Sequence, residues 1–212
     1  MASESIFTQL GSMVRNIVGS GSSYPTVKQR STVDGREYSV RDLPDKQRAA
    51  DLLAKLRMKL TTLMDTITQK YPDKPQVVRL GQNFKSDPNR FLESTPDSEH
   101  TSYSVNKGES VHFCLRQKDP SEQLVDDNIM MFVAIHEMAH MVTKSIGHEP
   151  DFWNNFGWLL REAEANKLYS PTDFKSHPVM YCGVSITDAP KYDPARDTDK
   201  DGTDFKIGSL FS

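Results

Sequence analysis

The feature that most constrains this chain is the pair His136 and His140, which follows an apolar run over residues 129–135. That run is apolar on every side, which predicts a helix buried all round. Helix positions i and i+4 lie on one face, so both imidazoles can reach one metal ion at about 2.0–2.1 Å. Hiding two histidines in a buried helix is otherwise costly. The pattern therefore predicts a zinc site, with Glu137 beside the ion.

A third ligand is expected just after this helix. We predict that the helix covers residues 126–146 and ends at Gly147, so that the chain turns back and presents His148. Three protein ligands and a water molecule form the open arrangement of a catalytic zinc site. We therefore expect one Zn²⁺ per chain. Glu162 or Glu164, on a following helix predicted at 150–167, is the alternative third ligand.

This site predicts the chemistry of a zinc-dependent endopeptidase. Zinc lowers the pKa of water towards about 7. Glu137 would act as general base and pass the proton to the leaving amine. Tyr181 or His177 would supply a hydrogen bond to the developing oxyanion. A protein or peptide substrate would pair, in extended form, with a hairpin predicted over residues 101–115.

The remaining patterns predict an α+β fold. Leucines at helical spacing indicate a helix over 44–70 that Asp42 caps, residues 77–80 indicate a strand, and 82–100 a polar loop. We expect a small, mostly antiparallel sheet packed on the helices 44–70, 126–146 and 150–167, within a domain spanning 34–190.

Both ends of the chain are expected to be appendages, over residues 1–33 and 191–212. Residues 3–18 have the pattern of a weakly charged amphipathic helix, which would dock on a capsid, a scaffold or a membrane surface. Residues 19–23 contain only glycine and serine and predict a flexible linker. The last segment is a polar tail.

The charge and the apolar content of the chain limit the kinds of partner and cellular location that we expect. The chain has 26 Lys and Arg and 29 Asp and Glu, which gives a net charge of −3. Residues 28–59 carry a local excess of positive charge, which a solvated helix face explains. A nucleic-acid partner is therefore not favoured. No apolar stretch reaches membrane-spanning length and no secretory signal is evident.

Cys114 and Cys182 are expected as free thiols in a reducing intracellular compartment. A Cys182 thiolate reaching the zinc is a regulatory hypothesis.

The motif resembles the zincin metallopeptidases of the WLM and SprT-like group. The resemblance rests on residues 136–140 and on His148-Glu149-Pro150-Asp151-Phe152-Trp153. The chain is most similar to WLM-like metallopeptidases of large DNA viruses, through residues 45–53, 101–108, 113–116 and 181–183, and the resemblance covers about 38–190. It implies a zincin-like fold, bound zinc, peptidase activity, and a place in the host cytoplasm or virion.

The chain departs from the family pattern at the third histidine. Seven residues, 141–147, separate His140 from His148, two more than WLM proteins usually have, which adds about half a helical turn. The family also implies proteolysis of proteins crosslinked to DNA.

Two alternative functions stay open at this stage. One is a virion, minor capsid or scaffold component with a structural or vestigial metal site. The other is a DNA-associated protease that acts on DNA-bound proteins. Glu137 favours a catalytic over a structural zinc site, because a purely structural zinc does not need that carboxylate.

Overall fold

The structure is a computed structural model of the 212-residue chain and describes residues 24–197. The amphipathic segment expected at 3–18 and the linker at 19–23 lie outside the described residues. So does the tail from residue 198 onward.

Five short strands form one sheet in the order β1-β2-β3-β5-β4. The β1/β2 and β5/β4 pairs are antiparallel, whereas β2/β3 and β3/β5 are parallel. The sheet is therefore mixed, with antiparallel pairs at its two edges, as expected for most of it, and parallel pairing at its centre. Two helices return the chain between β2 and β3, as parallel pairing requires. The strands are β1 (Thr26–Arg30), β2 (Glu37–Arg41), β3 (Phe91–Glu93), β4 (Tyr103–Val105) and β5 (Ser110–Phe113).

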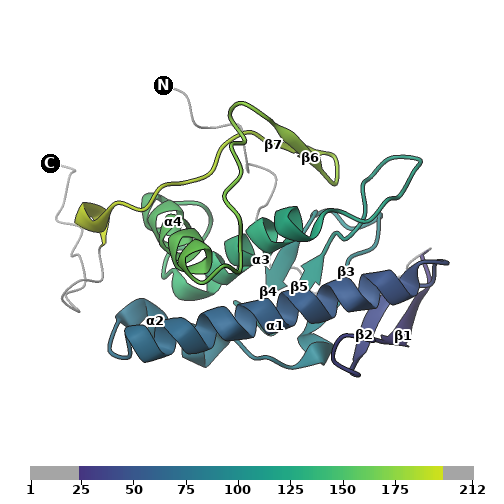
Figure 1. Ribbon diagram of the computed structural model, residues 1–212, viewed down its shortest axis with the longest axis horizontal. Coiled ribbons are helices and arrows are strands. Elements are labelled where there is room, and N and C mark those ends of the chain that lie inside the picture. Colours follow the sequence, from purple (N-terminus) through teal and green to yellow (C-terminus); the bar gives the residue numbers. More distant parts are fainter. Residues whose placement is uncertain (1–23, 198–212) are drawn as a thin grey trace, which may run out of the picture.

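Helices α1 (Lys46–Lys70), α3 (Asp127–Val142) and α4 (Pro150–Ala165) confirm the three predicted helices and the α+β class. In Figure 1, the long helix α1 runs along most of the molecule, and α3 and α4 lie above it in this view. The inward face of α1 repeats at helical spacing, which is why it is buried. A separate hairpin, β6 (Val179–Tyr181) and β7 (Val184–Ile186), follows α4.

The strand predicted at residues 77–80 is wrong, because this segment belongs to a helix, α2 (Pro75–Asn83). Pro75 occupies the first turn, where a missing N–H costs nothing. Val77 and Leu80 are buried and lie three residues apart, which is a helical spacing. Val78 between them is exposed, so the apolar pattern fits one helix face.

The stretch expected as a long loop at 82–100 also contains structure. It holds the short turn η1 (Pro88–Arg90) and β3, which is only three residues long. A strand of this length is too short to show a recognisable alternation of apolar and polar residues. It is defined by pairing with β2 and β5 on its two sides. The hairpin expected over 101–115 is confirmed by β4 and β5.

Helix ends differ from expectation in two places. Asp42 does not cap α1, because its carboxylate pairs with Lys46 at 2.7 Å and the first turn follows Asp45. Helix α3 ends at Val142 rather than at 146, because Thr143 has an extended backbone and its hydroxyl donates to the Ala139 carbonyl at 2.7 Å.

The folded body is longer than the domain expected at 34–190. Strand β1 pairs with β2 along its whole length, so the sheet begins before residue 34. At the other end, the turn η2 (Pro194–Arg196) leads to Asp197, which is buried and accepts a hydrogen bond from Gln76 of α2 at 2.7 Å. Within residues 24–197, none of the helices has the length and apolar character needed to span a membrane.

Cys114 and Cys182 form a disulfide, so the expectation of two free thiols is wrong. Cys114 follows β5 and Cys182 lies in the β6–β7 turn, where its φ of 49° is left-handed. The two residues are 68 positions apart, and no local pattern indicates that they meet. The bond attaches the β6–β7 hairpin to the end of the main sheet.

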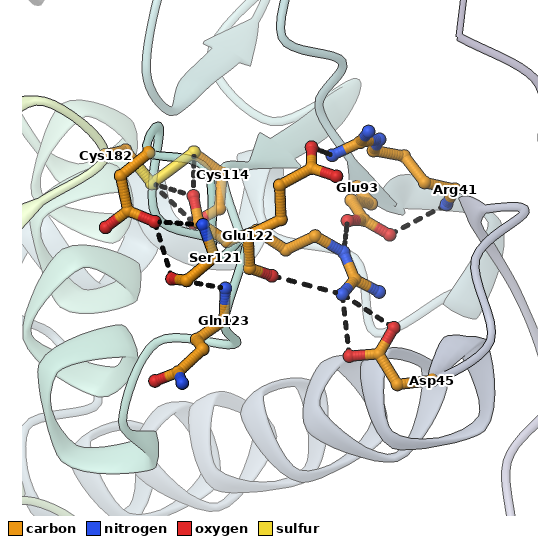
Figure 2. A network of polar contacts seen from close by, with 10 residues as sticks. Arg41, Asp45, Glu93, Cys114, Ser121, Glu122, Gln123 and Cys182 are labelled. Carbon is orange, nitrogen blue, oxygen red and sulfur yellow. Dashed lines mark hydrogen bonds and ion pairs between the residues drawn. A yellow bond between two sulfur atoms is a disulfide. The ribbon is translucent and has the colours of Figure 1, made fainter.

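A buried polar network holds the sheet end beside this disulfide (Figure 2). The Arg116 guanidinium donates from Nε to Glu93 at 2.8 Å and pairs with Asp45, the residue just before α1, at 2.7 Å. The backbone N–H of Arg41 donates to the other Glu93 oxygen at 2.7 Å, and its guanidinium pairs with Glu122 at 2.8 Å. Burial raises the pKa of Glu93, while these donors act in the opposite direction. The network joins β2, β3 and α1 to the segment that carries Cys114.

Candidate metal centre

Helix α3 places two predicted ligands and the predicted base inside the protein. The helix begins after Asp126, whose carboxylate accepts the backbone N–H groups of Asn128 at 2.8 Å and Ile129 at 3.3 Å. Its apolar residues are buried on all sides, as the sequence predicts. His136 and Glu137 are each only 1% exposed.

The three predicted histidines converge. The Nε2 atom of His136 lies 3.3 Å from Nε2 of His140 and 3.2 Å from Nε2 of His148. The ligand atoms of all three lie within 4.8 Å of one another. Two nitrogens bound tetrahedrally at 2.0–2.1 Å from one zinc ion would lie about 3.3 Å apart. The observed Nε2–Nε2 separations therefore fit a shared ion.

Burial also sets the protonation state of the three rings. It lowers the pKa of His136 well below its usual value and that of His140 to about 3, and it lowers the pKa of His148. Neighbouring histidines push the first two in the same direction. Neutral imidazoles carry the lone pair that a metal ion needs.

Glu137 is a buried carboxyl with no charged partner among the described residues. Among the described residues, its Oε2 atom has no hydrogen-bond partner. Burial raises the pKa of the Glu137 carboxyl to about 8. An uncompensated buried carboxylate beside neutral imidazoles is costly, and a divalent cation nearby would relieve that cost. The donor set and this carboxyl together fit a zinc ion.

Two aromatic residues of α4 form the wall behind the histidines. The Phe152 ring centroid lies 4.9, 4.4 and 4.7 Å from those of His136, His140 and His148. Trp153 stacks on His148 at 5.4 Å. Reasoning about ligands alone does not assign Phe152 a role. The signal available in the sequence is its place two residues after the helix-starting Pro150.

The two predicted oxyanion donors differ in placement. Tyr181 is buried, and its hydroxyl lies 2.6 Å from that of Ser102. Burial raises the pKa of Tyr181, and the negative charge of Glu137 acts in the same direction, which places the two side chains in one neighbourhood. His177 is exposed in the loop before β6 and is not part of the histidine cluster.

The alternative ligands are not part of the cluster. Glu162 is buried but accepts hydrogen bonds from Lys70 at 2.8 Å, Tyr71 at 3.0 Å and Arg161 at 3.0 Å. Glu164 is exposed. Cys182 is bonded to Cys114, so no thiolate is available for the proposed switch in this structure.

The comparisons find similarity to viral proteins and to a yeast protein of known structure. No family model matches the sequence. Uncharacterized protein R325 of Acanthamoeba polyphaga mimivirus is 29% identical over 161 residues, which cover 74% of this chain and 80% of that protein. Uncharacterized protein 042R of Invertebrate iridescent virus 3 is 36% identical over 83 residues, which cover 39% of this chain and 50% of that protein.

Among solved structures, the crystal structure of Wss1 from Saccharomyces cerevisiae aligns with a TM-score of 0.47 and 21% identity, over 60% of this chain and 87% of that one. The expected similarity to viral proteins is confirmed. These similarities assign no activity, so function has to be argued from the site.

Proposed function

We propose that this protein is a zinc-dependent endopeptidase of the zincin type. The observation that carries the proposal is the convergence of three imidazole Nε2 atoms, one buried and two half-buried, on the helix that also holds Glu137, a buried carboxyl whose Oε2 atom has no hydrogen-bond partner among the described residues. His136, His140 and His148 would hold the ion. A structural zinc site would more commonly use four protein ligands and would not need Glu137.

Glu137 is the general base of the proposed reaction. A zinc ion held by the three histidines supplies a Lewis acid that polarises the peptide carbonyl and makes water more acidic. Glu137 follows His136 directly on α3, and in this proposal its carboxylate would reach the water molecule that the ion activates. It accepts a proton from the attacking water and delivers it to the leaving amine nitrogen.

Tyr181 is the proposed donor to the oxyanion. Ser102 Oγ accepts the backbone N–H of Cys114 at 3.0 Å and lies 2.6 Å from the Tyr181 hydroxyl. When the serine hydroxyl donates to the tyrosine oxygen, the tyrosine proton is left to donate to substrate. Burial holds the pKa of Tyr181 above its usual value, so it keeps that proton at neutral pH.

The substrate is proposed to be an extended segment of a protein or peptide. Strand β4 forms one edge of the five-stranded sheet and contacts α3. A peptide can add to such an edge through backbone hydrogen bonds, which bind without demanding particular side chains. This assigns the first strand of the predicted 101–115 hairpin to substrate binding.

The deciding experiment measures zinc content and cleavage of unfolded casein on the same samples. The wild type should hold about one zinc per chain and cleave casein. Glu137→Gln should keep the zinc and lose at least about 100-fold in rate, because the general base is absent. Tyr181→Phe should lower the rate by about tenfold or more with zinc retained.

Glu149→Gln is the matched control, because Glu149 is an exposed glutamate next to His148. It should behave as wild type. Zinc binding without cleavage by the wild type would favour the structural or vestigial site of a virion component. Full cleavage by Glu137→Gln would contradict the proposed mechanism.

The cationic segment at 28–59 gives little support to the alternative function as a DNA-associated protease. Arg41, Lys46, Lys55 and Arg57 each pair with a carboxylate. Paired cations release fewer counterions on contact with phosphates, so they contribute less to DNA affinity.

A further inference from the structure

Where the chain leaves α3 towards His148, several backbone carbonyl groups need hydrogen-bond partners. The last four carbonyls of a helix have no partner inside it. Here, side chains of α2 bind the last two of them. Asn83 Nδ2 donates to the Met141 carbonyl at 2.9 Å, and Arg79 Nε donates to the Val142 carbonyl at 2.7 Å. Both donors belong to α2.

Lys107 continues this series past the end of the helix. Its Nζ donates to the Thr143 carbonyl at 2.8 Å and to the Lys144 carbonyl at 3.1 Å. A cation at a helix C-terminus also complements the helix dipole. Arg79, Asn83 and Lys107, which we call the carbonyl clamp, thus bind four consecutive carbonyls from 141 to 144.

The turn that presents Lys107 has an unusual backbone. Asn106 and Lys107 have φ values of 44° and 52°, a left-handed conformation that is unfavourable for residues with a Cβ atom. Gly108 follows with φ 119°, and a Cβ atom there would lie 2.7 Å from the Asn83 carbonyl oxygen. The β4–β5 turn is therefore pressed against α2. Strain of this kind persists where the surrounding structure imposes it, commonly at functional sites.

The opposite side of the same segment is tied to α4. Asn155 Nδ2 donates to the Thr143 hydroxyl at 3.0 Å, and the Ser145 hydroxyl donates to Asp151 at 2.6 Å. Residues 141–145 are thus held from both sides, and His148 follows three positions later. The extra length between His140 and His148 is the part of the site that most needs such support.

We propose that the carbonyl clamp, with Lys107 as its central member, positions His148 as the third metal ligand. Lys107 is a positioning residue and not a ligand, since it acts through the backbone at 143 and 144. The inference rests on the proposed function, because it presupposes a metal ion at the three histidines.

The test is a double-mutant cycle on Zn²⁺ affinity, measured by competition with a chelator. Lys107→Met should weaken Zn²⁺ binding by about tenfold or more, as loss of an outer support of a metal site does. In a His148→Ala background the same substitution should change affinity by less than about twofold, because its target is gone. The visible spectrum of the Co²⁺ form of Lys107→Met should shift towards that of His148→Ala.

Two control variants separate positioning from general stability. Lys107→Arg keeps a cationic donor and should restore most of the affinity. Lys55→Met removes a lysine that pairs with Asp127 at 2.9 Å at the other end of α3, and should leave affinity unchanged. If Lys107→Met does not fold, Asn83→Ala replaces it in the same cycle.

The outcomes distinguish the two claims. Wild-type protein that binds no Zn²⁺ overturns the proposed function and this inference with it. Wild-type binding with no loss in Lys107→Met and Asn83→Ala overturns the inference alone. An equal loss in the wild-type and His148→Ala backgrounds also overturns it, because the clamp would then act on the whole fold.

Discussion

At the scale of residues, the site depends on a hydrophobic side chain that binds nothing itself. Phe152 is fully buried and its ring packs against all three histidine rings. An imidazole ligand needs a fixed ring orientation, and this packing contributes to it. The three rings therefore share one support.

Phe152→Leu should weaken Zn²⁺ binding by about tenfold while costing only about 1–2 kcal/mol of stability, because volume is largely conserved but the ring contacts are lost. Phe174→Leu is the matched control, since Phe174 is equally buried and packs on Phe132 at 4.8 Å. Chelator competition and urea unfolding measure the two effects. Equal Zn²⁺ affinity in the two variants would contradict this role.

The burial of His112 determines one contribution to the pH dependence of the free energy of unfolding. It stacks on Tyr103 at 4.6 Å, and burial lowers its pKa to about 4. The unfolded chain therefore binds a proton between about pH 6.5 and 4 that the folded chain does not bind. The free energy of unfolding should fall as the pH is lowered through this window, by up to about 3 kcal/mol from this group.

Unfolding in urea at several pH values checks this prediction. His112→Gln should show a shallower fall than the wild type between pH 6.5 and 4. His177→Gln, which replaces an exposed histidine, is the control. Identical pH profiles for His112→Gln and the wild type would show that His112 does not contribute.

The candidate site could be predicted from the sequence where its members are close in the chain. His136, Glu137 and His140 share one helical turn, so their geometry follows from the helix alone. Phe152 and Lys107 required the fold, because their roles depend on packing between segments that the sequence does not align. His177 shows the opposite case, in which a suitable side chain lies outside the cluster.

At the scale of elements, the disulfide attaches the β6–β7 hairpin, and with it Tyr181, to the main sheet. In the chain-entropy estimate, closing a loop of this length stabilises the fold by about 4 kcal/mol. The bond joins residues 68 positions apart. Replacing both cysteines by alanine should therefore lower the free energy of unfolding by about 2–4 kcal/mol.

Urea unfolding of the double variant Cys114→Ala/Cys182→Ala checks this value, with the wild type under non-thiol reductant as the comparison. Zinc content should be unchanged, because neither sulfur is a ligand in this structure. Higher basal cleavage in Cys182→Ala would revive the thiolate switch and contradict a purely structural role.

Elements with a long periodic pattern were predictable and short ones were not. Helices α1 and α4 each bury a repeating apolar face, α3 is apolar on all sides, and the hairpin β4–β5 surrounds a glycine-containing turn. Strand β3 depends on partners far away in the chain, and α2 spans only nine residues, too few to separate helical from strand patterns.

At the scale of the whole molecule, the candidate metal site lies where several elements meet. The ligands come from α3 and the segment after it, and the supports come from α2, α4, the β4–β5 turn and the β6–β7 hairpin. Metal binding and folding should therefore be coupled, because a site of this kind does not exist in the unfolded chain.

Zinc removal should lower the thermal midpoint. At free Zn²⁺ near 100 times the dissociation constant, bound metal adds about 2.7 kcal/mol, which corresponds to about 5–10 °C for a chain of this size. Differential scanning calorimetry with and without a chelator measures the shift. Glu137→Gln should show it as well, whereas His140→Ala should show much less. No shift in the wild type would mean that the metal does not bind the folded site.

The most direct measurement is X-ray absorption at the zinc edge on the loaded protein. The account predicts three imidazole nitrogens and one oxygen at about 2.0–2.1 Å, and one imidazole fewer in His148→Ala. A sulfur ligand, fewer than three imidazoles in the wild type, or an unchanged shell in His148→Ala would contradict it.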